Sequence, residues 1–280
     1  MNGVIKKVAY RLCRNQYSIN GKKIERHRVS LEYWSKENNV GDALAPVILD
    51  WMLKKNNISR DQKVGKAVHL LTVGSILGMG RYPFDAVVWG SGIHCFSTMC
   101  RIIRYKNVRK LDIRAVRGPI TRQILILNGY HCPEIYGDPA ILMPLVYQPK
   151  SNREDNTIGI VRHFESADLA VDNKLKKIDT RTTDYEEFID QICKCSKIIS
   201  SSLHGIILAE SYGVPAVFLQ ENMDNELIKF YDWYYSTNRK NIKIAYSIEE
   251  AIEMEPMSLP DLEKMRKNLL EQFPYDLWRD

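Results

Sequence analysis

The sequence has no long hydrophobic run: nowhere do about 20 apolar residues follow one another, as a membrane-spanning helix requires. The first fifteen residues lack the apolar core of a secretory signal peptide, so we expect a cytoplasmic protein. The six cysteines are scattered along the chain, which indicates free thiols in a reducing compartment. Cys193 and Cys195 are too close together for a zinc knuckle and have no second ligand pair, so no metal site is expected.

The signatures of several well-known sites are also missing. There is no G-x-x-x-x-G-K-[ST] phosphate loop, no H-E-x-x-H zinc motif and no G-x-S-x-G nucleophile motif. Gly74, Gly78 and Gly80 are not spaced like the G-x-G-x-x-G of dinucleotide binders, so no organic cofactor is expected. Zinc-finger spacings and RNP-like aromatic motifs are absent too, which argues against nucleic acid as a partner.

Basic residues are concentrated in the first half of the chain. The overall composition, 45% hydrophobic and 26% charged, is typical of a soluble globular protein. Residues 1–150 contain 24 Lys and Arg against 10 Asp and Glu, whereas residues 151–280 contain 16 against 24. Such a half attracts an anionic membrane surface or a diphosphate lipid, and an ordinary solvated face is the alternative. Two clusters account for most of the excess: Lys6, Lys7, Arg11, Arg14, Lys22, Lys23, Arg26 and Arg28, then Arg101, Arg104, Lys106, Arg109, Lys110, Arg114, Arg117 and Arg122.

Apolar runs alternate with amphipathic segments along the chain, a pattern that predicts an α/β fold with parallel sheets and crossover helices. The expected strands are 29–34, 69–73, 86–89, 113–116, 134–136, 157–161, 197–200, 216–219 and 242–246. The expected helices are 43–53, 120–127, 185–193, 205–211 and 259–273. A polar stretch at 148–156 has the composition of a linker, so we expect two Rossmann-like domains, 1–150 and 151–280, with a C-terminal helix. Ligands of such folds bind at the carboxyl ends of the strands, here in a cleft between the domains.

The segment from Ile198 to Leu219 predicts a strand, a polar turn, a helix, a second turn and a second strand. Ser200, Ser201 and Ser202 offer oxygens that can cap the helix, and Gly205 allows close approach of a ligand. The free N–H groups of the first helical turn and the helix dipole favour an anion. His204 at this position can act as a general acid, although a helix-capping role is the alternative.

Four further residues are candidates because of their position at the ends of strands. Asp42 is the expected N-cap of the helix after the first strand, and a sugar-binding carboxylate is the rival interpretation. Arg117 and Arg162 each follow a strand and can bind a carboxylate or phosphate, with a plain ion pair as the alternative. Trp89 lies beside glycines and can stack on a sugar ring or fill the core.

A set of short motifs occurs in a fixed order between about residues 29 and 220. They are Asn39-Val-Gly-Asp42, Val73-Gly-Ser75, Trp89-Gly-Ser-Gly92, Ala115-Val-Arg-Gly118, Gly137-Asp-Pro-Ala140 and Ser200-Ser-Ser-Leu-His-Gly205. Together they resemble the polysaccharide pyruvyl transferase family. The resemblance implies a fold similar to that of two-domain GT-B glycosyltransferases. It also implies transfer of the enolpyruvyl unit of phosphoenolpyruvate to a sugar, usually to form a cyclic ketal.

The resemblance places the donor near Leu203, His204 and Arg117. Many members of the family have Arg directly before Leu-His, whereas this chain has Ser202. We therefore expect Arg117, Arg162 and the backbone at Gly205 to supply the missing donor contacts. The complete candidate site has His204, Asp42 and Asp138 as catalytic groups; Arg117, Arg162, Ser200, Ser201, Ser202, Leu203 and Gly205 around the donor; and Asn39, Gly41, Trp89, Gly90 and His94 around the acceptor.

We therefore expect a cytoplasmic pyruvyl transferase that modifies a capsular or exopolysaccharide repeat unit. The basic first half favours an acceptor linked to undecaprenyl diphosphate at the inner face of the membrane. Two alternatives stay open. One is a GT-B glycosyltransferase that uses a nucleotide sugar, because His204-Gly with Glu210 resembles its donor site. The other is a glycan-binding subunit without catalytic activity.

Overall fold

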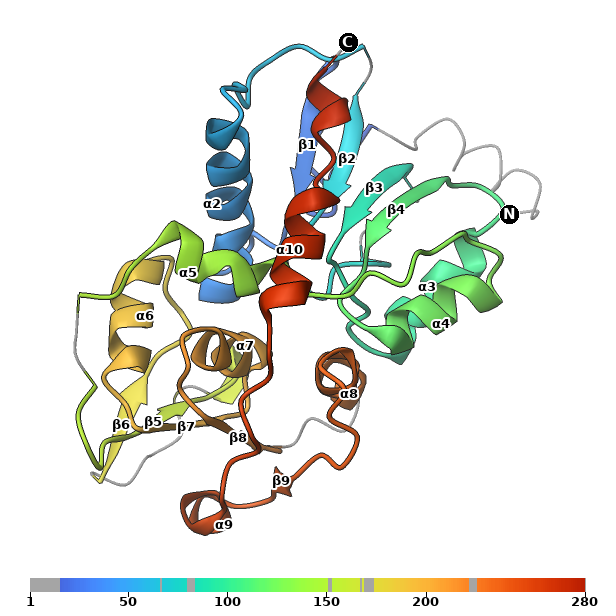
Figure 1. The fold of residues 1–280 in the computed structure, drawn as a ribbon. Coiled ribbons are helices and arrows are strands. Elements are labelled where there is room, and N and C mark those ends of the chain that lie inside the picture. Colours follow the sequence, from blue (N-terminus) through green and yellow to red (C-terminus); the bar gives the residue numbers. More distant parts are fainter. Residues whose placement is uncertain are drawn as a thin grey trace.

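The computed structural model describes residues 16–65, 67–79, 84–150, 153–166, 168, 174–221 and 226–279. Lys6, Lys7, Arg11 and Arg14 of the first basic cluster, and Gly80, lie outside these residues. Two parallel sheets, each with its own helices, make up the described chain, which confirms the predicted α/β class (Figure 1). No helix among the described residues has both the length and the apolar character that crossing a bilayer would need.

The first sheet has the order β1-β2-β3-β4, and all of its strands run parallel. Its strands are β1 (Val29–Glu32), β2 (Val68–Leu71), β3 (Ala86–Trp89) and β4 (Leu111–Ala115). The helices of this half are α2 (Val40–Lys55), α3 (Phe96–Tyr105), α4 (Pro119–Leu127), the short 3-10 helix η1 (Pro139–Leu142) and α5 (Met143–Val146). The expected strand 134–136 is reduced to a single bridge between Tyr136 and Val116.

The second sheet has the order β6-β5-β7-β8-β9 and is also parallel. Its strands are β5 (Ile158–Val161), β6 (Leu175–Ile178), β7 (Lys197–Ser200), β8 (Ala216–Leu219) and β9 (Ile244–Ala245). The helical segments of this half are η2 (Phe164–Ser166), α6 (Tyr185–Cys193), α7 (Leu203–Ser211), α8 (Leu227–Ser236), α9 (Ile248–Glu253), α10 (Glu263–Glu271) and η3 (Tyr275–Trp278).

Helix α7 is apolar on nearly all sides, and every residue from Gly205 to Ser211 is buried. It packs against α2, α6 and η1 as well as against strands of its own sheet. A helix that is apolar all round needs such a central place. The consequence for the site is that the N-terminus of α7 is held rigidly against the N-terminus of α2.

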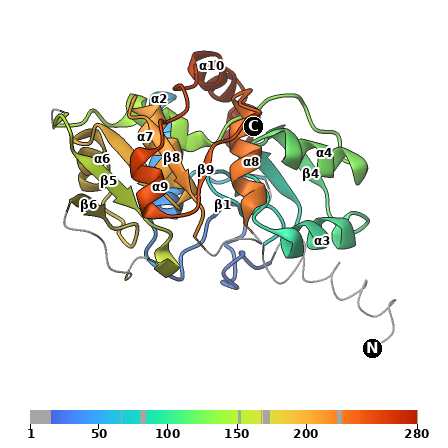
Figure 2. The ribbon, with the colours of Figure 1, turned by 90° about the horizontal axis from the view of Figure 1, so that it is seen from below.

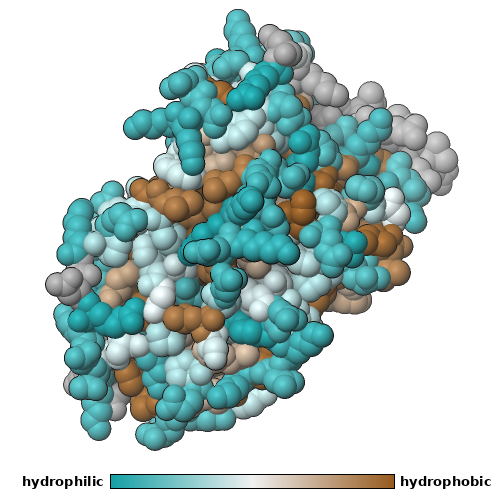
Figure 3. Space-filling model, viewed as in Figure 1, coloured by the Kyte–Doolittle hydropathy of each residue, from teal (hydrophilic) through white to brown (hydrophobic). Residues whose placement is uncertain are grey.

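The C-terminal segment returns to the first sheet. The Trp89 indole at the end of β3 donates a hydrogen bond to the Leu269 carbonyl of α10 (2.9 Å) and meets the Phe273 ring edge-on. Arg114 of β4 forms an ion pair with Asp276 (2.8 Å). Helix α10 presents a hydrophilic outer side to solvent (Figure 3). Contacts between distant parts of the sequence therefore connect the two halves of the chain.

Candidate active site

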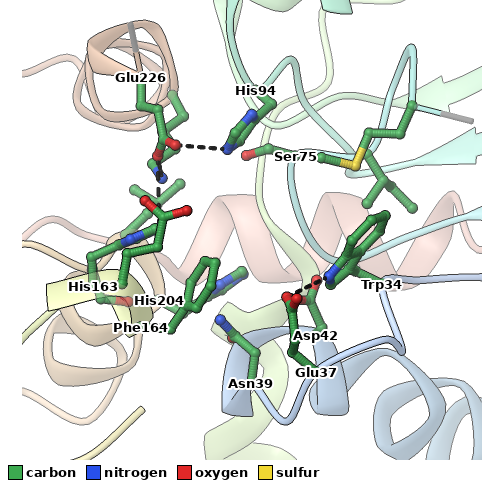
Figure 4. Close-up of a pocket in the computed structure, with 16 residues that line it drawn as sticks. Trp34, Glu37, Asn39, Asp42, Ser75, His94, His163, Phe164, His204 and Glu226 are labelled. Carbon is green, nitrogen blue, oxygen red and sulfur yellow. Dashed lines mark hydrogen bonds and ion pairs between the residues drawn. The ribbon is translucent and has the colours of Figure 1, made fainter. Parts of the chain in front are cut away.

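A pocket of about 350 Å³ lies where the carboxyl ends of strands from both sheets come together (Figure 4). Residues that follow β1, β2 and β3 form one side, and residues that follow β5 and β7 form the other. The lining residues are Trp34, Glu37, Asn39, Asp42, Ser75, Ile76, Met79, His94, His163, Phe164, Glu165, Ser202, Leu203, His204, Glu226 and Lys229. Carboxyl ends of parallel strands are the expected ligand-binding edge of such sheets.

His204 lies in this pocket at the start of α7, directly against the first turn of α2. A Cβ atom placed on Gly41 would lie 2.0 Å from His204 Nδ1, so only glycine leaves room for the imidazole there. His204 Nε2 lies 3.7 Å from Asp138 Oδ2, and neither of these buried atoms has a hydrogen-bond partner within the described residues. Asp138 is completely buried and caps η1 by accepting a hydrogen bond from the Ala140 amide (3.0 Å). The Asp138 carboxylate thus lies on the Nε2 side of the imidazole.

Asp42 lines the pocket beside His204, but it is not the helix cap. Asn39 caps α2, and its side chain accepts a hydrogen bond from the Gly41 amide (2.9 Å). Asp42 is the third residue of the helix and lies in its first turn, three positions after the cap, so the expected capping role is wrong. Burial raises the pKa of Asp42 from 3.8 to about 6, against the opposing charges of His204, His94 and Lys229. The structure thus brings together all three predicted catalytic groups.

A second polar cluster faces this trio across the pocket, centred on the Glu226 carboxylate (Figure 4). His94 Nε2 lies 3.3 Å from one carboxylate oxygen of Glu226, and His163 Nε2 lies 3.7 Å from the other, where Lys229 also forms an ion pair. Burial tends to raise the pKa of Glu226, but His94 and Lys229 outweigh it and lower this pKa. Three groups that can carry positive charge therefore converge on one carboxylate.

The basic groups of this cluster differ in their protonation. Burial, with the charge of Lys229, lowers the pKa of His163 to about 4, so His163 is neutral near pH 7. Burial would lower the pKa of His94, but its hydrogen bond to Glu226 and the charge of that carboxylate raise it overall. Burial lowers the pKa of Lys229. This end of the pocket can therefore bind an anionic group of a ligand without an additional basic residue.

The serines before α7 have mainly structural roles. Ser200 and Ser201 are completely buried, with Ser201 Oγ bonded to Glu221 Oε2 (2.9 Å). Ser202 occupies the N-cap position without a capping hydrogen bond from its side chain, so the expected capping by Ser202 is wrong. Of Ser200, Ser201 and Ser202, it is Ser202 that reaches the pocket, together with Leu203.

Gly205 also serves packing rather than ligand approach. A Cβ there would lie 2.4 Å from Ser200 Oγ and 2.7 Å from the Val161 side chain. Glycine thus lets α7 lie close to β5 and β7. The expectation that Gly205 meets a ligand is corrected by this position.

Arg117 does not line the pocket. Its guanidinium is completely buried, forms an ion pair with Asp232 of α8 (3.2 Å) and donates to the Ile93 carbonyl (2.7 Å) and to Ser75 Oγ. A Cβ on Gly92 would lie 2.4 Å from its central carbon, so glycine makes room for it. Direct donor binding by Arg117 is therefore not supported; Arg117 holds the pocket wall in place through Ser75.

Arg162 is likewise buried behind the wall, where it pairs with Glu221 (3.2 Å). Its Nε and Nη1 atoms have no hydrogen-bond partner among the residues that the structure describes. The next residue, His163, is the one that reaches the pocket. The predicted direct role of Arg162 at the donor is therefore not supported either.

Trp89 and Gly90 are core residues, not acceptor contacts. Trp89 is completely buried against α10, and a Cβ on Gly90 would lie 2.4 Å from Pro139. The indole that does face the pocket is that of Trp34, whose Nε1 donates to Glu37 Oε2 (3.1 Å). Asn39 and His94 line the pocket as predicted, and Gly41 contributes by admitting His204.

The pocket also contains residues that the sequence patterns do not predict, among them Trp34, Glu37, Phe164, Glu226 and Lys229. Trp34 ends the predicted strand 29–34 and Glu37 follows it, and this position could have drawn attention to them. Glu226 and Lys229 begin a helix that the sequence does not signal, so no pattern pointed to them. Within the described residues, no group of three or more His, Cys, Asp or Glu could hold a metal ion.

The fold and pocket define a two-sheet α/β protein with its polar site at the strand ends. Comparison with known proteins identifies the family: the model of the polysaccharide pyruvyl transferase family matches residues 80–222, just over half of the chain. The chain belongs to this family.

Individual relatives are distant. The chain is 28% identical over 226 residues to the uncharacterized protein L143 of Acanthamoeba polyphaga mimivirus, covering 75% of each chain. It is 27% identical over 211 residues to the succinoglycan biosynthesis protein ExoV of Rhizobium meliloti (strain 1021), covering 72% of this chain and 62% of ExoV. A solved structure of a functionally uncharacterized protein from Klebsiella pneumoniae has a TM-score of 0.51 at 15% identity, covering 88% of this chain and all of the other. That likeness shows a shared fold.

Proposed function

We propose that the protein transfers the enolpyruvyl unit of phosphoenolpyruvate to a sugar of an exopolysaccharide or capsular repeat unit. In this proposal the repeat unit is carried on a lipid diphosphate at the cytoplasmic face of the membrane. Two GT-B-like Rossmann domains, 1–150 and 151–280, would enclose the site. The family match and the name of ExoV support the chemistry. The carrying observation is that His204 and Asp42, from the two halves of the chain, line one pocket, and that the buried Asp138 carboxylate lies 3.7 Å from His204.

In the proposed reaction, protonated His204 gives its proton to C3 of the donor, which leaves an oxocarbenium-like centre at C2. One sugar hydroxyl attacks C2 and passes its proton to Asp42. Phosphate then departs, and a neighbouring hydroxyl attacks the same carbon to close the ketal. Asp42 gives the first hydroxyl proton to the departing phosphate, and the proton of the second hydroxyl returns to His204. Asp138 stabilises the imidazolium.

The donor's negative charge needs partners other than Arg117 and Arg162. We propose that its phosphate binds at the first turn of α7, where the backbone N–H groups lack partners within the helix. His94 and Lys229 lie on the other side of the pocket and can stabilise the donor carboxylate. Trp34, Glu37 and Asn39 then form the acceptor side, with an aromatic face and polar groups suited to a sugar.

The nucleotide-sugar alternative loses part of its basis. Glu210 is buried, pairs with Arg239 (2.8 Å) and accepts a hydrogen bond from the Trp233 indole (2.9 Å), so it does not face the pocket. A purified sample should therefore release phosphate from phosphoenolpyruvate when a lipid-linked sugar is present, and should release no UDP from UDP-sugars. Release of UDP would support the glycosyltransferase, and sugar binding without release of either would support the glycan-binding subunit.

His204→Ala tests the proposed acid. We expect phosphate release to fall by about 10²–10⁴-fold, the usual contribution of general acid–base catalysis, with an unchanged circular dichroism spectrum. A loss below about threefold in a folded variant would assign His204 to structure instead. His163→Ala serves as a comparison, because His163 is neutral near pH 7 and cannot be the proton donor there.

A further inference from the structure

Helix α3 has an apolar outer face. Phe96 is 68% exposed and Ile103 is 47% exposed, and residues seven positions apart lie on the same side of a helix. Met99 and Cys100 lie between them and are half-buried. The opposite side of α3, formed by Thr98, Ile102 and Tyr105, packs into the core. The two exposed side chains, Phe96 and Ile103, therefore contribute little to the packing of this half.

Basic residues flank this stripe on both sides. Arg104 and Lys106 are exposed and project to either side of Ile103, and Lys110 follows just beyond the helix. The sequence has no Asp or Glu between Ile93 and Leu111. An apolar stripe flanked by basic residues, with no acidic residue nearby in the sequence, is the pattern of a helix that lies in the plane of an anionic bilayer.

The helix also has a definite relation to the pocket. His94 lines the pocket, Cys95 occupies the N-cap position of α3, and Phe96 is the first helical residue. In the view from below, α3 lies at one edge of the molecule, on the opposite side from α10 (Figure 2). A surface that contacts Phe96 would therefore lie next to the pocket.

We propose that α3 binds the surface of an anionic bilayer, with Phe96 and Ile103 at the level of the acyl chains and Arg104, Lys106 and Lys110 among the headgroups. Binding of α3 to the bilayer is independent of the chemistry in the pocket. That this contact delivers a lipid-linked acceptor rests on the proposed function. The two claims are separable, because one is measured with vesicles alone and the other by phosphate release.

The experiment uses the full chain and vesicles of phosphatidylcholine with or without phosphatidylglycerol, sedimented at low and at high salt. We expect binding to the anionic vesicles only, and a steep loss of binding as salt screens the exposed charges. Arg104→Glu with Lys106→Glu should lower the partition coefficient by at least about 30-fold at low salt, the ratio expected for two lipid-facing basic residues. Phe96→Ala with Ile103→Ala should weaken binding while its salt dependence is retained.

Tyr246→Ala is the matched control, because Tyr246 is 67% exposed but lies in the acidic half of the chain. This variant should bind as the unchanged protein does. All the substituted side chains are on the surface, so unfolding temperatures should agree within a few degrees, which confirms that the variants are folded. If vesicle binding survives both α3 double substitutions, the proposal is overturned and the binding belongs to another basic cluster. If the Phe96 and Ile103 double variant changes its oligomeric state but not its vesicle binding, the stripe is a protein interface. That result would also overturn the proposal.

Discussion

At the scale of single residues, the site depends on how Gly41 and His204 fit together. They lie 163 positions apart in the sequence, yet the imidazole occupies the space that a side chain at position 41 would need. The motif Asn39-Val-Gly-Asp42 therefore has two separate roles: Asn39 starts the helix, and Gly41 admits the histidine. The sequence predicts an acceptor contact at Gly41, because spacing alone does not reveal which distant residue a glycine faces.

Gly41→Ala should displace the imidazole, because its Cβ would lie 2.0 Å from Nδ1 of His204. We expect turnover to fall by about 10²-fold, since misplacing a catalytic group by about 1 Å has that effect. Stability should change little, as alanine suits a helix better than glycine. The control is Gly65→Ala, where nothing lies within 4 Å of the added Cβ, so activity should be retained. Full activity of Gly41→Ala would separate His204 from the chemistry.

Asp42 gives a second prediction at this scale. Its pKa is raised to about 6, so between pH 3.8 and 6 the folded state holds a proton that the unfolded state has lost. Stability due to this group therefore falls as pH rises through that range and stays lower above it. Asp42→Asn should raise the unfolding free energy at pH 7 by at most about 3 kcal/mol and leave it unchanged below pH 4. Urea denaturation at both pH values measures the difference.

The exposed carboxyl of Asp50 on the same helix provides the control. Asp50→Asn removes an exposed ion pair with Arg60 and should change stability by less than about 1 kcal/mol. If Asp42 accepts the acceptor's proton, turnover of the unchanged protein should rise with pH through about 6. Asp42→Asn should remove that rise together with most of the activity. If Asp42→Asn and the unsubstituted protein had the same unfolding free energy at every pH, the raised pKa of the buried Asp42 carboxyl would be contradicted.

At the scale of elements, the N-terminus of α7 is the most consequential. Ser202 has no capping bond from its side chain and faces the pocket, in the place where the resemblance to the family implies arginine. The side chain there can be changed without removing a cap. The adjacent Ser201 is completely buried, accepts a hydrogen bond from the His163 amide and bonds to Glu221. The two serines thus differ sharply in what they tolerate.

Ser202→Arg should fold normally and lower the KM for phosphoenolpyruvate, because it adds a cation beside the proposed phosphate position. Ser201→Arg is the matched control and should fail to fold stably, since it buries an unpaired charge. Thermal unfolding and donor titration measure the two effects. A folded but inactive Ser202→Arg would show that position 202 has a different use in this chain.

The elements that the sequence predicted well are the buried ones. Strands 86–89, 197–200 and 216–219 and helix 185–193 agree with the structure at both ends. Two of the strands are uninterrupted apolar runs, the third is an apolar pair between Lys197 and Ser200, and a capping aspartate starts the helix. Helices α3 and α8 were missed, since Cys95 and Glu226 are weak start signals and aromatic residues fill α8. Strand β6 was missed because two lysines interrupt its apolar pattern. The second polar cluster was missed along with α8.

Burial was the other limit of sequence reasoning about the site. His204, Asp42 and Asp138 do lie near one another, because each follows a strand or turn at the same edge of the sheets, and their catalytic roles stay a prediction. Arg117 and Trp89 occupy similar positions in the sequence but point into the core. Which way such a side chain points depends on partners far along the chain, Asp232 for the arginine and Leu269 for the tryptophan.

At the scale of the whole molecule, Asp232 of α8 holds the two halves of the chain together. Its carboxylate accepts hydrogen bonds from the amides of Ile120 and Thr121 at the start of α4 (2.9 and 3.0 Å) and from the Thr121 hydroxyl (2.6 Å). It also forms the ion pair with Arg117. Helix α8 supplies Lys229 to the pocket as well, so this buried network fixes one wall of the site relative to the first sheet.

Asp232→Ala should lower the unfolding free energy by about 3–5 kcal/mol, because it leaves the buried Arg117 without its counter-charge. Arg117→Met should be destabilising too, and the double variant should lose less than the sum of the two, as residues of one network do. Arg60→Met, which breaks an exposed ion pair with Asp50, should cost less than about 1 kcal/mol.

The KM for the donor distinguishes a structural role of Arg117 in the pocket wall from direct donor binding by Arg117. If Arg117 holds only the wall, folded samples of Arg117→Met and Asp232→Ala should show similar changes in KM. A large rise in KM for Arg117→Met alone, at preserved stability, would return Arg117 to the donor.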